Sequence, residues 1–144
     1  MGRIIVHLYG KPKDQLIANI IENYSKRVKN NGISLQFYSD KKNKLDYEQS
    51  LIKLKGNLIL IDENGEQISS IKLSELLSKF LISSESTNFA VGPPDGFSND
   101  IKSKISKSIS LSTFTLTHEM AAVIIMEQLY RSTEILKGTQ YHRN

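Results

Sequence analysis

The sequence predicts one α/β domain with a mostly parallel sheet and helices on both of its faces. Short β-branched apolar runs alternate along the chain with longer segments whose apolar residues recur at helical spacing. This alternation is typical of strand–helix–strand units that bury a parallel sheet between two helical layers. A length of 144 residues without an internal repeat or a linker fits one domain, residues 1–144.

The first third of the chain predicts two strands with a helix between them. The run from Ile4 to Leu8 is short and β-branched, as in a buried strand. Asp14 is a plausible N-cap for a helix in which apolar residues recur at helical spacing as far as Val28. Ser34 to Tyr38 then alternates apolar and polar residues, which indicates a second strand.

The middle of the chain continues the alternation. Tyr47 to Lys55 is a short helix candidate, and the apolar run from Asn57 to Asp62 predicts a third, buried strand. Asn64-Gly65 is a turn signal, so we expect the chain to turn there. Ile71 to Leu81 has its leucines on one face and predicts a helix.

The last part of the chain adds a fourth strand from Thr87 to Val91 and a polar helix from Ser98 to Ser106. Ser108 to Ser112 is a short strand or a loop. A long final helix begins after its N-cap, Thr117, and ends near Leu136.

Composition limits the possible functions. There are no cysteines, so disulfides and thiolate chemistry are excluded, and the three histidines lack metal-ligand spacing, so we expect no metal site. No apolar run approaches the ~20 residues of a membrane helix, and we expect a cytoplasmic protein.

Charge is distributed unevenly along the chain. Residues 1–55 hold 11 Lys and Arg against 5 Asp and Glu, whereas residues 56–144 hold 8 Lys and Arg against 10 Asp and Glu. A basic half fits a phosphate-binding surface, although a solvated lysine-rich surface explains it equally well.

The loop from Gly92 to Gly96 (Gly-Pro-Pro-Asp-Gly) follows a predicted strand and precedes a predicted helix. Ligands of open α/β sheets bind outside the carboxyl ends of the strands. Glycines let the backbone approach a ligand, and two prolines reduce the entropy lost on binding. The loop has neither of the glycine patterns that bind phosphates, and a tight strand–helix connection is the simpler interpretation of it alone.

The segment from Ser110 to Leu116 places hydroxyls beside apolar residues. This combination suits adenine recognition, and it equally suits a strand edge followed by a helix cap.

The last predicted helix carries further candidate residues. His118 lies in its first turn, where the helix dipole favours the neutral ring. Glu127 and Arg131 are spaced for an i,i+4 pair, which is structural or catalytic.

The segment from Tyr141 to Asn144 contains an aromatic ring, an imidazole and a guanidinium within four residues. These groups can stack on a base, transfer a proton near neutral pH and bind phosphate. Chain ends are more often tolerant of change, so the tail alone does not establish a function.

Together these segments, from Phe89 to Asn144, resemble the RlmH family of SPOUT methyltransferases in order and spacing. Lys11 and the Tyr24-x-x-Arg27 spacing match the family's N-terminal half more loosely. The resemblance implies an α/β knot fold with a C-terminal trefoil knot, a feature that general topology rules disfavour. It also implies a homodimer that uses S-adenosylmethionine to methylate N3 of a pseudouridine in 23S rRNA of the assembled 70S ribosome.

The resemblance also implies roles for individual residues. His142 and Arg143 would assist loss of the N3 proton, and Tyr141 would position the base. The tail of one subunit would complete the site of the other. The residues that match the family's cofactor-binding positions are Ile61, Gly92, Leu111, Ser112, Thr113, Phe114, Thr115 and Leu116.

Three positions depart from the family pattern. Pro93 replaces a glycine, Ala122 replaces an arginine, and Thr117 replaces a proline. Pro93 removes a backbone donor from the loop and Ala122 removes a cation, whereas Thr117 still caps a helix. A catalytically impaired RNA- or ribosome-binding paralogue is therefore one alternative, and a small nucleotide-binding regulator without an RNA role is another.

Overall fold

Five parallel strands form the central sheet of this computed structural model, which describes residues 2–143. Their order across the sheet is β2-β1-β4-β3-β5, and every neighbouring pair is parallel. The strands span Ile4–Tyr9 (β1), Ile33–Tyr38 (β2), Asn57–Gln67 (β3), Thr87–Val91 (β4) and Ser108–Ser110 (β5).

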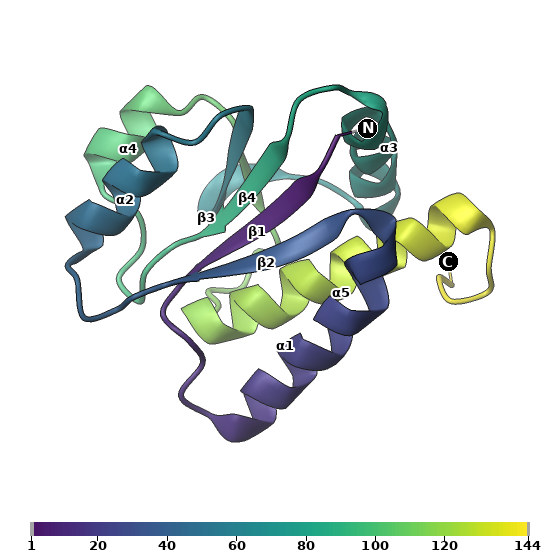
Figure 1. Cartoon of the computed structure of the whole chain (residues 1–144), viewed down its shortest axis with the longest axis horizontal. Coiled ribbons are helices and arrows are strands. Elements are labelled where there is room, and N and C mark those ends of the chain that lie inside the picture. Colours follow the sequence, from purple (N-terminus) through teal and green to yellow (C-terminus); the bar gives the residue numbers. More distant parts are fainter. Residues whose placement is uncertain (1, 144) are drawn as a thin grey trace.

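Helices cover both faces of the sheet, as predicted (Figure 1). On one face α5 packs between α1 and α3, and α2 and α4 lie together on the other face. The helices span Gln15–Val28 (α1), Lys44–Ile52 (α2), Ser70–Ile82 (α3), Asn99–Lys104 (α4) and His118–Lys137 (α5), and a 3-10 turn, Lys29–Asn31, follows α1.

The strand β4 shows how a central strand contributes to the core on both faces of the sheet. Phe89 and Val91 point into the larger core cluster, beneath α1, α3 and α5. Ala90, between them, points into the smaller cluster beneath α2 and α4. Because successive side chains of a strand alternate between faces, a strand covered on both sides is buried at every position, and in β4 this includes the polar residues Thr87 and Asn88.

The predicted helix boundaries are confirmed where a cap defines them. Asp14 accepts a hydrogen bond from the backbone N–H of Leu16, and Thr117 accepts one from Met120. The helix α2 begins three residues before the predicted start, because Asn43 caps it by accepting a hydrogen bond from Asp46.

The predicted turn at Asn64-Gly65 is wrong. The strand β3 continues to Gln67, and Ile61 and Glu66 both pair with Ile109 of β5, so the register shifts between them. A Cβ on Gly65 would lie 2.7 Å from the backbone of Ile109. Glycine is therefore required here for close backbone approach and not for a turn.

Candidate active site

A cleft of about 270 Å³ opens at the carboxyl end of β4, beside the middle of β3, where these two strands cease to pair. The loop Gly92–Phe97 forms one wall, and residues from Ser110 to Leu116 form another. Ile61 and Val91, the residues at which β3 and β4 pair last, contribute apolar surface. This is the edge of the sheet at which ligands bind in open α/β proteins.

Seven of the eight predicted cofactor-binding residues line this cleft, and they come from three separate segments of the chain. Thr113 is not among the lining residues. The seven are Ile61, Gly92, Leu111, Ser112, Phe114, Thr115 and Leu116.

Charged side chains at the cleft were not among the predicted site residues. Asp62, Glu63 and Asp95 contribute three carboxylates, and Lys102 contributes one ammonium, which lies 3.4 Å from Asp62. The acidic pair directly follows the apolar run of β3, and this position is the signal that could have identified it. The excess of carboxylates suits a ligand that carries positive charge. Among residues 2–143, no three His, Cys, Asp or Glu side chains gather closely enough to hold a metal ion.

The glycine loop has a defined shape. The N–H of Gly96 donates to the carbonyl of Pro93 over 2.8 Å, and Gly96 has a φ of +82°, which favours glycine. A Cβ on Gly92 would lie 3.3 Å from the ring of Phe97. The loop therefore packs tightly against its own last residue while it presents its backbone to the cleft.

The hydroxyls of the serine-rich segment mainly shape the segment itself. Ser110 donates to the carbonyl of Ser112 over 2.9 Å, and the Ser112 hydroxyl accepts from the N–H of Phe114 over 2.9 Å. The ring of Phe114 is 78% exposed at the rim of the cleft. Backbone groups and apolar surface therefore remain available to a ligand.

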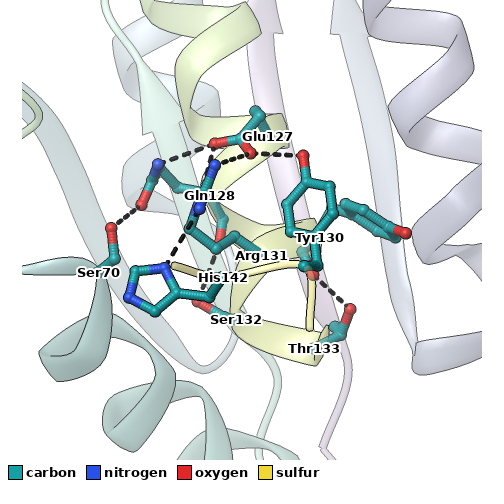
Figure 2. Close-up of polar contacts among 9 residues, drawn as sticks. Ser70, Glu127, Gln128, Tyr130, Arg131, Ser132, Thr133 and His142 are labelled. Carbon is teal, nitrogen blue, oxygen red and sulfur yellow. Dashed lines mark hydrogen bonds and ion pairs between the residues drawn. The ribbon is translucent and has the colours of Figure 1, made fainter. Parts of the chain in front are cut away.

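The C-terminal tail lies elsewhere, against the last turns of α5 (Figure 2). The hydroxyl of Tyr141 donates to Glu127 over 2.7 Å, and Arg131 donates to Nδ1 of His142 over 3.2 Å. The predicted i,i+4 pair of Glu127 and Arg131 is present at 2.9 Å. Arg143 is exposed, and Asn144 lies outside the described residues.

The environment of the tail alters the pKa values of Tyr141 and of Arg131, to which the tail is bonded. Burial raises the pKa of the Tyr141 hydroxyl above its ordinary value, and the hydrogen bond to Glu127 raises it further. The same carboxylate raises the pKa of Arg131. The ring of Tyr141 also meets Tyr130 edge-on, with 4.8 Å between their centroids, so the tail is docked by packing as well as by charge.

The tail and the cleft of one chain do not form a single site. His118, at the start of α5, lines the cleft, whereas Arg131 holds the tail three to four turns further along the same helix. At 1.5 Å per residue these two positions are ~20 Å apart along the axis. The three predicted catalytic residues are brought together with one another, and not with the cofactor-binding residues of their own chain.

The departures from the family pattern have clear locations. Pro93 lines the cleft as part of the glycine loop. Ala122 is buried and lines a small hollow of about 10 Å³ next to the cleft, together with residues that include Gly10 and Pro12. Thr117 caps α5.

A family model described as "Predicted SPOUT methyltransferase" matches residues 3–142. The chain belongs to the SPOUT methyltransferase family. Its curated relatives include ribosomal RNA large subunit methyltransferase H of Prochlorococcus marinus strain SARG, 37% identical over 99% of this chain and 97% of that protein. The protein of the same name from Flavobacterium psychrophilum is 35% identical over 92% of this chain and 94% of its own length.

The resemblance seen in the sequence motifs is therefore confirmed, and this SPOUT chain matches its relatives over nearly their full length. Among solved structures, TrmJ from Z. mobilis ZM4 superposes with a TM-score of 0.57 and 7% sequence identity, over 100% of this chain and 72% of that one. At that identity the likeness supports the fold alone.

Proposed function

We propose that the protein transfers a methyl group from S-adenosylmethionine to N3 of a pseudouridine in 23S rRNA, in the assembled 70S ribosome. Membership of a methyltransferase family and the names of the full-length relatives support the reaction and the rRNA substrate. The observation on which the proposal rests is the cleft at which the glycine loop Gly92–Phe97 meets the segment Ser110–Leu116.

The residues of the cleft fit the proposed donor. S-adenosylmethionine supplies a methyl group bonded to a positively charged sulfur. Asp62, Glu63 and Asp95 outnumber the single lysine at the cleft and favour that charge. Gly92 leaves space beside Phe97 that a side chain would fill, and Ile61 offers apolar surface to the adenine.

The proposal includes a trefoil knot in the C-terminal third, which the likeness to the family implies. The two walls of the cleft come from the segments after β4 and after β5, which are the segments that such a knot would hold together. A knot would fix both walls without an external brace, and alignment of donor and acceptor is the main contribution of an enzyme to methyl transfer.

The tail is proposed to act on the pseudouridine ring. N3 is a poor nucleophile until it loses its proton, which passes to solvent water, and the ring then carries negative charge. N3 takes the methyl group as the bond from that group to sulfur breaks, and S-adenosylhomocysteine leaves. His142 and Arg143 can stabilise that charge as hydrogen-bond donors. Tyr141 is engaged with Glu127, so its contribution is to position the tail.

We propose that the protein is a homodimer in which the tail of one subunit completes the cleft of the other. Within one chain the tail and the cleft are ~20 Å apart along α5. The tail residues that complete a given cleft must therefore come from another subunit. Leu16, Ile20, Phe114 and Met120 are apolar and exposed on and near the first turns of α1 and α5, where a second subunit could cover them.

The basic residues of the first 55 positions would hold rRNA phosphates, and action on ribosomes places the protein in the cytoplasm. In residues 2–143, no helix has both the length and the apolar character needed to cross a membrane.

Mass spectrometry of 23S rRNA tests the proposal directly. Cells that lack this protein should lose one methyl group on a pseudouridine, and expression of the protein should restore it. Unchanged rRNA would contradict the proposal. Calorimetry with S-adenosylmethionine then distinguishes the alternatives, because a non-enzymatic RNA-binding paralogue would bind ribosomes and not the donor.

A further inference from the structure

Three side chains of α2 bond to the glycine loop of the cleft or to the residues that flank it, Val91 and Ser98, although no residue of α2 lines the cleft. Tyr47 and Glu48 are neighbours on this helix, and each is only 2% exposed. Tyr47 packs in the smaller core cluster together with Phe97 of the loop and Ile101 of α4. A buried hydroxyl and a buried carboxylate must find hydrogen-bond partners, and both find them at the loop.

Tyr47 holds the start of the loop. Its hydroxyl lies 2.6 Å from the carbonyl oxygen of Val91, the last residue of β4 before Gly92, and 3.2 Å from that of His7. Burial raises the pKa of Tyr47 well above its ordinary value, so the hydroxyl keeps the proton that it donates. Its ring also stacks on Phe97, with 6.5 Å between the centroids.

Glu48 holds the end of the loop. One carboxylate oxygen accepts from the backbone N–H of Ser98 over 2.7 Å, and the other accepts from the Ser98 hydroxyl. Ser98 follows the loop directly and is the N-cap of α4. Both carboxylate oxygens of Glu48 thus accept hydrogen bonds from Ser98, the residue that directly follows the loop.

The third contact, between Lys44 and Asp95 at 3.4 Å, is of a weaker kind. The side chain of Asp95 is 76% exposed, and exposed ion pairs contribute little. The loop also has few backbone donors of its own, because Pro93 and Pro94 have none. Its geometry therefore depends mainly on the two buried anchors on α2.

We propose that Tyr47 and Glu48 are positioning residues that set the shape of the loop Gly92–Phe97 for the methyl donor. They would act through Val91 and Ser98 without touching the donor. The proposal rests on the proposed function of the cleft, since it assigns the donor as the ligand. Misplacement of a reacting group by ~1 Å can reduce a rate by about a hundredfold, so a loop fixed at both ends matters for transfer as well as for binding.

The test uses variants of the full chain that remove hydrogen bonds and preserve side-chain volume. Tyr47→Phe removes the hydroxyl and keeps the stacked ring, and Glu48→Gln keeps one acceptor oxygen where Glu48→Ala keeps none. We expect the Kd for S-adenosylmethionine, measured by calorimetry, to rise by up to roughly tenfold in Tyr47→Phe, because binding must then restore a loop geometry that one hydrogen bond maintains in the free protein. Glu48→Gln should retain more affinity than Glu48→Ala.

Tyr38→Phe is the matched control. Tyr38 belongs to the same aromatic cluster, with its ring centroid 5.1 Å from that of Tyr47, and its hydroxyl bonds to Nδ1 of His7 over 2.8 Å. The control loses a comparable hydrogen bond that does not reach the loop. We expect it to lower the melting temperature while the donor Kd changes less than about twofold. Equal changes in Kd for Tyr38→Phe and Tyr47→Phe would mean that both act through general stability, and the proposal would be wrong.

Hydrogen exchange separates failure of this proposal from failure of the proposed function. The amides of Gly92–Ser98 should exchange faster in Tyr47→Phe and Glu48→Gln than in Tyr38→Phe, whether or not a donor binds. Unchanged exchange in this segment overturns the anchoring role. Faster exchange in the variants, combined with a wild-type protein that does not bind S-adenosylmethionine, would support the anchors and contradict the assigned ligand. Ser98→Ala combined with Glu48→Gln should do less harm than the sum of the two single variants, because both weaken the bond between the Ser98 hydroxyl and the carboxylate, while Ser98→Ala also removes the N-cap of α4.

Discussion

The guanidinium of Arg131 donates a hydrogen bond to Nδ1 of His142 over 3.2 Å. Arginine has no acceptor and stays protonated, so Nδ1 must accept, and the proton of the neutral imidazole is then on Nε2. Glu127 binds the other side of Arg131 at 2.9 Å and fixes it in place. In this tautomer His142 presents an N–H to a substrate and no lone pair. We therefore expect it to stabilise negative charge on the ring and not to remove the proton as a base.

Substitution of His142 tests this role. In His142→Gln the terminal amide nitrogen can take the place of Nε2 as a donor, whereas His142→Ala offers no donor. We expect His142→Ala to lower the rate of methyl transfer by about 10²-fold or more, as loss of a charge-stabilising donor does. His142→Gln should retain a measurable part of the activity, and both variants should bind S-adenosylmethionine with a Kd within about twofold of the wild type.

Single-turnover methylation of ribosomes and calorimetry give the two quantities. If His142→Gln is as inactive as His142→Ala, the ring acts as a base and the donor role is wrong. If donor affinity falls as much as the rate, then His142 belongs to the donor site and not to the proposed catalytic group.

The hydroxyl of Tyr141 should determine how firmly the tail is docked. Tyr141→Phe keeps the ring against Tyr130 and removes the 2.7 Å hydrogen bond to Glu127. We expect faster hydrogen exchange after Gly138 and a loss of stability of about 0.5–1.5 kcal/mol. Tyr130→Phe is a matched control that should change tail exchange less. No change in Tyr141→Phe would show that packing alone docks the tail.

The hydrogen bond of Tyr141 also has a defined pH range. Its pKa is raised from 10.0, so the folded state holds the proton more tightly than the unfolded chain does. The contribution to stability is therefore complete below about pH 10 and is lost only as the pH rises through the folded-state pKa. The contribution of the Tyr141 hydroxyl to docking of the tail should accordingly not change with pH across the physiological range.

The strand and helix pattern could be predicted because each element is specified locally. The caps at Asp14 and Thr117 and the apolar run of β3 are visible in neighbouring residues. The failed turn at Asn64-Gly65 had a local signal too, but pairing with β5 more than 40 residues later overrides it. Local patterns thus succeeded except where a distant strand decides the backbone.

The site was predictable in part, for the same reason. The cofactor-binding segments were found through motifs, yet the bond between Glu48 and Ser98 joins residues 50 positions apart and has no local pattern. The separation of the tail from the cleft depends on the length and direction of α5. The resemblance to a family identified the residues but not their distances.

Stability should fall at acidic pH because of His7. This ring is buried, and its Nε2 faces Oδ1 of Asn88 at 2.8 Å. The Asn88 amide nitrogen donates to the carbonyls of Lys55 and Asn57, so Oδ1 accepts and Nε2 carries the proton. Nδ1 then accepts from the Tyr38 hydroxyl over 2.8 Å, and the neutral ring is fully bonded.

Burial lowers the pKa of His7 below 6.5, while the hydrogen bond to Asn88 opposes this in part. The unfolded chain therefore binds a proton more readily than the folded one. Stability is complete above about pH 6.5 and decreases as the pH falls below it, by at most ~1.4 kcal/mol per pH unit from this group. Urea denaturation at pH 8, 6 and 5 measures the slope. His7→Gln should reduce this slope, and an unchanged slope would assign it to carboxylates instead.

Binding to ribosomes should depend on the basic residues between β2 and α2. Lys41 and Lys42 are exposed, and reversing both to glutamate removes two adjacent cations from the basic first 55 residues. If both contact phosphates, the slope of log K against log salt should decrease in magnitude by about 1.4–1.8, and affinity should fall most at low salt. Sedimentation with 70S ribosomes across a salt series measures both quantities.

The matched control is the double variant Lys72→Glu, Lys79→Glu on α3, which changes the net charge by the same amount as the variant of Lys41 and Lys42. Equal losses in the two variants would mean that net charge alone drives binding, whereas a loss confined to the first pair locates the rRNA on the side of the molecule where α2 begins.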